Sequence, residues 1–139
     1  MKKSVEEKIL EDEIIDVLIH WLQKDGWYIK SFCKGQTRGI DILAEKEKKI
    51  FIIEAKGAKG NPSNKNTRRE KFDSGQLFTH LGVAIIKVLK ERNNYPGAQI
   101  AIAHPDDEYI KKVLSPIIPD LKKTGIQFLW VNTNGKVSD

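Results

Sequence analysis

Apolar residues recur at intervals of three and four in residues 4–24, and short apolar runs replace this pattern further along the chain. The first segment predicts an amphipathic helix, which Asp25 and Gly26 end. Its apolar positions are Leu10, Ile14, Val17, Leu18, Trp21 and Leu22. Three strands are predicted next, at residues 27–33, 39–44 and 49–55, because β-branched and aromatic residues are frequent there and glycine or charged turns divide them. We expect the last two to form a hairpin.

The second half of the chain continues with alternating helix and strand patterns. A second long helix is predicted over residues 69–91, with a buried stripe made of Leu77, Leu81, Ala84, Ile85 and Val88. Strands are predicted at 98–104 and 126–131, separated by a helical stretch that Pro116 and Pro119 interrupt. Residues 57–67 are rich in Gly, Lys, Asn, Pro and Ser and predict a loop. The order αβββαβαβ indicates an α/β fold, with a mixed sheet and helices on both faces.

Charged residues interrupt the two most apolar strands. Because successive side chains of a strand point to opposite faces, Ile52, Glu54 and Lys56 share one face. On the preceding strand Asp41 lies between two isoleucines, where a carboxylate is costly unless something compensates its charge. If the hairpin closes around residues 45–49, Asp41 lies opposite Glu54 to within about two residues.

A divalent cation is the obvious compensator for two neighbouring carboxylates. Asp41 and Glu54, helped by the backbone carbonyl of Ala55, offer the hard oxygen ligands that Mg²⁺ prefers, and Mn²⁺ is expected to substitute. Such a metal polarises a phosphodiester and activates a bound water, and Lys56 could orient that water or neutralise charge on phosphorus. The alternative is a surface ion pair between Glu54 and Lys56, which is common and energetically minor.

Asp41, followed thirteen residues later by Glu54, Ala55 and Lys56, resembles the motif of the PD-(D/E)XK nuclease superfamily. Within it, the chain is similar to proteins related to archaeal Holliday-junction resolvases and Mrr-like restriction endonucleases, over residues 5–90. The resemblance implies a restriction-endonuclease-like αβββαβ core, a metal held by Asp41 and Glu54, and Lys56 as the catalytic lysine. Ile40 replaces the proline of the family's first motif, which weakens the match slightly.

The resemblance also implies two supporting residues on the helices. Related families place a glutamate of the first helix on the water shell of the metal, and Glu13 is predicted for this role, with Asp12 and Asp16 as alternatives. Many members carry a glutamine or lysine of the second helix that reaches the active site, and Gln76 is the best match. An ordinary exposed glutamine is the alternative for Gln76.

The net charge of +5 is concentrated in one segment. Residues 56–71 contain six basic residues and one acidic residue, whereas the other 18 basic and 18 acidic residues cancel. A basic patch favours a polyanionic partner such as DNA, although a solvated loop has the same composition. The residues expected to contact phosphates, without reading base sequence, are Lys34, Arg38, Lys59, Lys65, Arg68, Arg69 and Lys71.

Composition limits the remaining possibilities. The 139 residues, 40% hydrophobic and 31% charged, fit one domain over residues 1–139, with no apolar run long enough to cross a bilayer. The N-terminus lacks the apolar stretch of a secretory signal, and a single cysteine excludes an internal disulfide, so we expect a cytoplasmic protein without a membrane partner. No glycine-rich phosphate loop supports a small-molecule enzyme.

These observations together predict a Mg²⁺-dependent DNA endonuclease of the structure-selective, repair or restriction type. Cutting two strands requires two sites, so we expect a homodimer, and a partner subunit could supply sequence specificity. The alternative from another functional class is a non-catalytic nucleic-acid-binding module that kept the fold and the basic loop.

Overall fold

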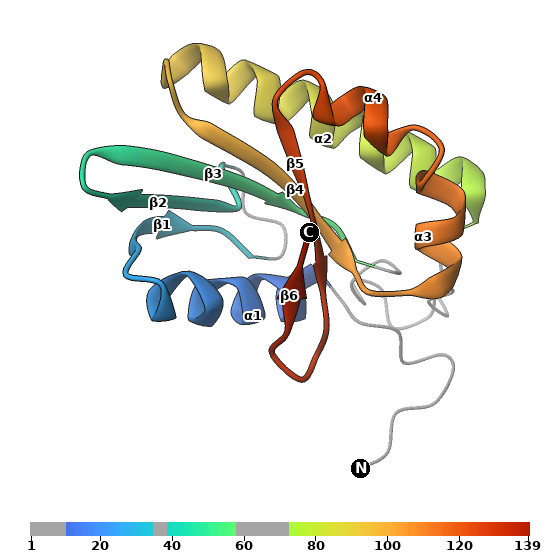
Figure 1. Ribbon diagram of the computed structural model, residues 1–139, viewed down its shortest axis with the longest axis horizontal. Coiled ribbons are helices and arrows are strands. Elements are labelled where there is room, and N and C mark those ends of the chain that lie inside the picture. The colour runs from blue at the N-terminus through green and yellow to red at the C-terminus, as the bar shows by residue number, and fades with distance from the viewer. Residues whose placement is uncertain (1–10, 35–38, 58–72) are drawn as a thin grey trace.

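The computed structural model describes residues 11–34, 39–57 and 73–139, and in this part of the chain one six-stranded mixed sheet lies between helices on both faces (Figure 1). The helices are α1 (Glu11–Lys24), α2 (Ser74–Asn94), α3 (Glu108–Leu114) and α4 (Ile118–Lys122). The strands are β1 (Tyr28–Phe32), β2 (Ile42–Lys46), β3 (Lys49–Ala55), β4 (Gln99–Pro105), β5 (Ile126–Val131) and β6 (Val137–Ser138). The predicted α/β class and the αβββαβ order are confirmed.

The strands lie side by side in the order in which they occur along the chain. The pairs β3–β4 and β4–β5 are parallel, and the pairs β1–β2, β2–β3 and β5–β6 are antiparallel. Parallel neighbours need a crossover connection, which α2 supplies between β3 and β4 and which α3 and α4 supply between β4 and β5. Helix α1 covers one face of the sheet, and α2 lies on the other (Figure 1).

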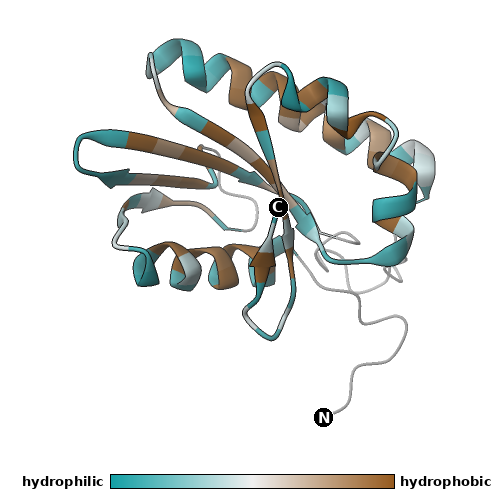
Figure 2. Cartoon of the chain, viewed as in Figure 1, coloured by the Kyte–Doolittle hydropathy of each residue, from teal (hydrophilic) through white to brown (hydrophobic). Residues whose placement is uncertain are grey.

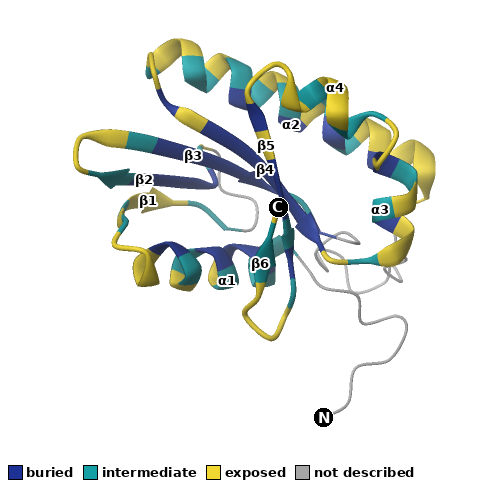
Figure 3. Ribbon diagram, viewed as in Figure 1, coloured by how far each residue is buried: buried dark blue, intermediate teal, exposed yellow. Residues whose placement is uncertain are grey.

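Buried apolar residues of the sheet and the helices form one core, and Figure 2 marks the apolar residues along these elements in brown. Strands β3 and β4 are the most buried, whereas the edge strand β1 is largely exposed (Figure 3). The two long helices contribute one buried stripe each: Ile14, Ile15, Leu18 and Leu22 from α1, and Leu77, Leu81, Ala84 and Val88 from α2. Among the described helices, none is both long and apolar enough to span a membrane.

Several boundaries differ from the predictions for local reasons. Helix α2 begins at Ser74 and not at residue 69, because Asp73 has extended backbone angles and accepts a hydrogen bond from the Gln76 N–H as its N-cap. Strand β2 continues to Lys46, because Glu47 and Lys48 both adopt positive φ and form a tight turn. Strand β6 was not predicted, since two residues are too few to give a periodic pattern.

Candidate active site

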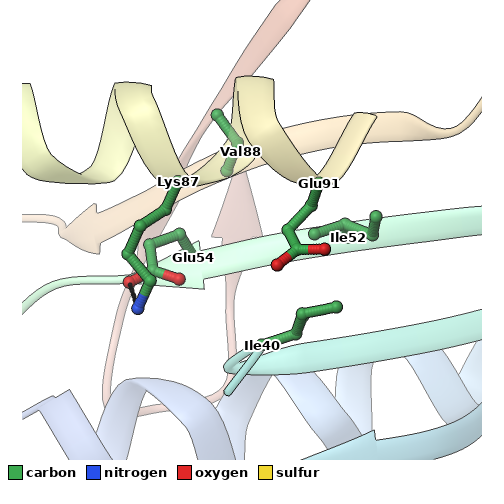
Figure 4. Close-up of a pocket in the computed structure, with 6 residues that line it drawn as sticks. All are labelled: Ile40, Ile52, Glu54, Lys87, Val88 and Glu91. Carbon is green, nitrogen blue, oxygen red and sulfur yellow. Dashed lines mark ion pairs between the residues drawn. The ribbon is translucent and has the colours of Figure 1, made fainter. Parts of the chain in front are cut away.

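The β2–β3 hairpin brings the two predicted carboxylates together. Ile42 pairs with Ile53 in the antiparallel register, so the next position outward sets Asp41 opposite Glu54, as predicted. The two carboxyl groups are close enough for each to affect the pKa of the other. Glu54 belongs to the face of β3 that lies under α2 (Figure 4). The candidate site therefore lies at the end of β3, between the sheet and α2.

Asp41 is buried and is held by the backbone of the neighbouring strands. Its Oδ2 accepts a hydrogen bond of 2.9 Å from the N–H of Ala55, and its carbonyl oxygen accepts one of 3.0 Å from the N–H of Cys33. Burial raises the pKa of Asp41 above its usual value, although the Ala55 N–H and the charges of Lys87 and Lys56 oppose that rise. The carboxyl group is thus fixed in position but insufficiently compensated when ionised.

Glu54 is only 4% exposed and carries the larger perturbation. Burial and the adjacent Asp41 charge raise its pKa to about 7, even though two ammonium groups oppose the rise. Lys87 Nζ lies 2.8 Å from Glu54 Oε2, and Lys56 Nζ lies 3.8 Å from the same oxygen. Figure 4 shows Lys87 reaching down from α2 to Glu54. Two lysines therefore do not fully compensate the pair of buried carboxylates.

Lys56 follows β3 directly, and its backbone N–H donates a 2.9 Å hydrogen bond to the carbonyl of Ala103 on β4. Its side chain is more buried than that of Lys87, at 18% against 42% exposed. Burial lowers the pKa of the Lys87 ammonium, but its hydrogen bond to Glu54 and the charges of Glu54 and Asp41 outweigh burial, so that the pKa is raised. Both lysines lie at the site, and only Lys56 was predicted.

The first helix places an acid that was not predicted, Glu11, near the site. Burial and the charge of Asp41 raise the pKa of Glu11, while the charges of Lys56 and Lys87 oppose the rise, so Glu11 lies within the electrostatic reach of the site. Glu13 is half-buried two positions further along α1, and its predicted role at the metal stays a prediction. Asp16, an alternative candidate, is exposed and pairs with Lys34.

Gln76 has a structural task at the start of α2. Its side-chain oxygen accepts a hydrogen bond of 2.9 Å from the N–H of Asp73, which completes a capping box. The side chain is exposed, and nothing further in the structure supports or opposes its predicted reach to the active site.

Of the predicted phosphate contacts, the structure describes only Lys34. It forms an ion pair with Asp16 of α1, and both side chains are partly exposed to solvent. The other predicted residues lie outside the described part of the chain: Arg38, Lys59, Lys65, Arg68, Arg69 and Lys71. Their contact with DNA stays a prediction.

The donor atoms fit a magnesium ion that keeps part of its water shell. In the part of the chain that the structure covers, no group of three or more His, Cys, Asp or Glu side chains is arranged to hold a metal. Mg²⁺ usually takes one or two protein carboxylates and several waters, so Asp41, Glu54 and the carbonyl of Ala55 are a sufficient set. Two adjacent buried carboxyls with raised pKa values are the groups that a divalent cation would stabilise most in their ionised form.

A histidine that received no predicted role lies deep on the same side of the sheet. His104 of β4 is 1% exposed and stacks on Phe128, with 6.3 Å between the ring centroids. Neither ring nitrogen has a hydrogen-bond partner among the described residues. Burial, followed by the charges of Lys56 and His80, lowers the pKa of His104 to about 3. His104 is therefore neutral at physiological pH.

The fold and the site together define an α/β protein with a buried carboxylate pair and two lysines at the end of a central strand. No protein-family model matches the sequence, and no curated protein matches it. Two solved structures are similar in fold. An XisH family protein from Nostoc punctiforme has a TM-score of 0.59 and 19% identity, over 92% of this chain and 98% of that one. An fdxN element excision controlling factor protein from Anabaena variabilis has a TM-score of 0.59 and 18% identity, over 92% and 97%.

Proposed function

We propose that this protein is a Mg²⁺-dependent DNA endonuclease in which Asp41 and Glu54 hold the metal and Lys56 is the catalytic lysine. The observation that carries the proposal is the hairpin register, which sets two buried carboxyls opposite each other with Lys56 Nζ 3.8 Å from Glu54. A surface ion pair, the alternative considered from sequence, does not account for this burial, since Glu54 is only 4% exposed. The arrangement also agrees with the resemblance to PD-(D/E)XK nucleases.

Each residue has a distinct task in this proposal. The bound cation would supply Lewis acidity for the phosphodiester and a water of lowered pKa. Asp41, fixed by the Ala55 N–H, and Glu54, fixed by β3, would hold it in one position. Lys56 follows the strand whose carboxylate binds the metal, so its ammonium lies where it could orient the attacking water or neutralise charge on the phosphate. A rigid central strand gives these groups the fixed geometry that catalysis requires.

DNA is the substrate that we propose, for two reasons. The basic residues of segment 56–71 and the net charge of +5 favour a polyanion. One of the two similar structures is named as a factor that controls excision of the fdxN element, which is consistent with a role in DNA excision control. We also propose a homodimer, because cutting both strands requires two sites, and a partner subunit would supply sequence specificity.

The test is cleavage of supercoiled plasmid, four-way junction, flap, single-stranded, duplex and methylated duplex DNA in Mg²⁺ or Mn²⁺. Asp41→Asn and Lys56→Met should each lower the cleavage rate by about a hundredfold or more, as expected for loss of a metal ligand or of charge stabilisation. Asp120→Asn is the matched control, because the Asp120 side chain is 83% exposed and lies on α4. DNA affinity, measured by fluorescence anisotropy, should change little in all three variants.

If the wild-type protein cuts none of these substrates but retains them equally in every variant, the proposal is wrong. That outcome would favour the alternative function, a nucleic-acid-binding module without catalysis. Activity equal to wild type in Asp41→Asn would also refute the proposed site, because it would show that cleavage does not depend on the carboxylate pair.

A further inference from the structure

The buried oxygen Glu54 Oε2 is shared by two ammonium groups of different origin. Lys56 belongs to the end of β3, and its ammonium lies at 3.8 Å. Lys87 belongs to α2, and its ammonium lies closer, at 2.8 Å, within the range of a charge-assisted hydrogen bond. The closer ammonium is also the more exposed, at 42% against 18%. The primary counter-ion of Glu54 is thus a flexible side chain that can leave toward solvent.

A cation bound to Glu54 would compete with Lys87 for the same negative charge. Like charges a few ångströms apart repel strongly where burial lowers the effective dielectric constant. Glu54 is 5% exposed at its side chain, so water screens this repulsion poorly. Lys56 is already further from the oxygen, and its backbone is anchored to Ala103, which makes Lys87 the ammonium that has to move.

The structure offers Lys87 a second partner nearby. A pocket beside Glu54 is lined by Ile40, Ile52, Glu54, Lys87, Val88 and Glu91 (Figure 4). Glu91 lies one helical turn beyond Lys87, and side chains four residues apart on a helix are neighbours. Figure 4 shows the Glu91 carboxylate pointing down from α2 toward β3, like Lys87. Glu91 Oε1 accepts a 3.2 Å hydrogen bond from the side-chain amide of Asn94, and the spacing of four residues would let a displaced Lys87 ammonium reach the Glu91 carboxylate by side-chain rotation alone.

We propose that Lys87 is a tethered counter-ion of Glu54, which binding of a divalent cation displaces toward Glu91. This inference rests on the metal site of the proposed function but does not require that the protein cleaves DNA. Its consequence is that Lys87 weakens metal binding, whereas Asp41 and Glu54 create it. Lys87 is thus a positioning residue that sets the cation concentration at which the site fills.

The experiment measures Mn²⁺ binding to the full chain by electron paramagnetic resonance, without DNA. A pH of about 8 keeps proton competition small, because it lies above the pKa of about 7 of Glu54. Lys87→Met should bind Mn²⁺ about tenfold more tightly than wild type, which corresponds to about 1.4 kcal/mol. Lys87→Gln removes the same positive charge with a polar side chain and serves as a second variant. Lys90→Met, an exposed lysine of the same helix, is the matched control and should leave the Kd within about twofold.

Two further variants complete the test. Glu54→Gln should abolish the tight Mn²⁺ site, and Glu91→Gln should weaken binding about threefold, because displaced Lys87 then has no second carboxylate. An unchanged or higher Kd in both Lys87 variants would overturn the inference, as would Mn²⁺ binding that does not depend on Glu54. A Kd unaffected by Glu91→Gln would overturn the transfer to Glu91.

The outcomes separate this inference from the proposed function. Tighter Mn²⁺ binding in Lys87→Met, without DNA cleavage by any form, would refute the endonuclease and leave the counter-ion role of Lys87 intact. Cleavage by the wild type, with an unchanged Kd in both Lys87 variants, would refute only the counter-ion role.

Discussion

Replacing His104 with leucine should change how the stability of this protein depends on pH. The histidine is fully buried on β4, and neither ring nitrogen has a hydrogen-bond partner among the described residues. Burial, followed by the charges of Lys56 and His80, lowers its pKa to about 3. In the unfolded chain the pKa of a histidine is about 6.5. Between these two values the unfolded form binds a proton that the folded form does not bind, so acid favours unfolding.

The magnitude follows from the width of that window. Each pH unit between the two pKa values costs the folded state about 1.4 kcal/mol for one proton. Because the unfolded histidine is already half protonated at about pH 6.5, acidification to about pH 4.5 should cost the wild type roughly 2.3 kcal/mol that His104→Leu does not lose. This is a large share of the roughly 5–15 kcal/mol that stabilises a typical domain. The buried carboxylates shift the curves of both proteins equally, so the difference isolates His104.

The assay is urea denaturation at several pH values from about 7 to about 4.5, followed by circular dichroism. His20→Leu is the matched control, because it removes a histidine that is exposed on α1. Proton NMR of the His104 ring provides a second readout, and the ring should stay neutral throughout this range. If the wild type and His104→Leu lose stability in parallel, or if the His104 ring titrates near pH 6.5, the buried neutral histidine is refuted.

Five other variants test neighbouring features of the structure. Burial raises the pKa of Glu54 to about 7, so its ionisation above that pH destabilises the folded state. With a chelator present, the free energy of unfolding of Glu54→Gln should therefore rise by about 3 kcal/mol relative to that of the wild type between about pH 4.5 and pH 8.5. An equal pH dependence of the two proteins in urea denaturation would contradict this. Asp73→Ala should cost about 1 kcal/mol by removing the N-cap of α2, which a lower melting temperature would reveal. If Gln76→Ala lowers cleavage but not the melting temperature, its predicted active-site role holds. Glu11→Gln should raise the Mg²⁺ concentration needed for half-maximal stabilisation about tenfold, and Glu13→Gln less than twofold. A larger effect of Glu13→Gln than of Glu11→Gln would instead support the predicted role of Glu13.

The local patterns of the sequence were sufficient for the strands and for the carboxylate pair. Alternation along residues 49–55 placed Ile52 and Glu54 on one face, and the structure confirms the hairpin register that sets Asp41 opposite Glu54. These inferences depend on a period of two and on a short turn, both of which are local properties. The αβββαβ order follows in the same way, because each element has its own hydrophobic period.

The residues that the helices place near the site could not be identified from the local pattern alone. The buried stripe of α1 runs through Ile14, Ile15, Leu18 and Leu22, and Glu11 lies three, four and seven residues before its first three members. The predicted stripe included Val17 and Trp21, which shifted the face expected to be buried and favoured Glu13. A stripe that included Ile15 as well as Ile14 would have added Glu11 to the candidates.

Lys87 could not be predicted from local pattern alone. It meets Glu54 across 33 positions of sequence, and that contact depends on how α2 crosses β3. A weaker signal existed, because the polar stripe from Asp73 through Gln76 and His80 reaches Lys87 seven residues beyond His80. Following that stripe to the end of the helix would have added Lys87 to the candidates.

The placement of Glu54 and Lys56 at the end of the most buried strand has two opposite energetic consequences. Burial raises the cost of every uncompensated charge, as the pKa of about 7 of Glu54 shows. The same burial strengthens the attraction of the carboxylate pair for a cation, because the effective dielectric constant is lower than in water. Lys87 partly relieves this cost, so the folded chain tolerates the pair. If the proposed metal site is correct, the stability of the metal-free protein and its affinity for the metal are opposed through the Lys87 side chain, and a Lys87 variant that increases one should decrease the other.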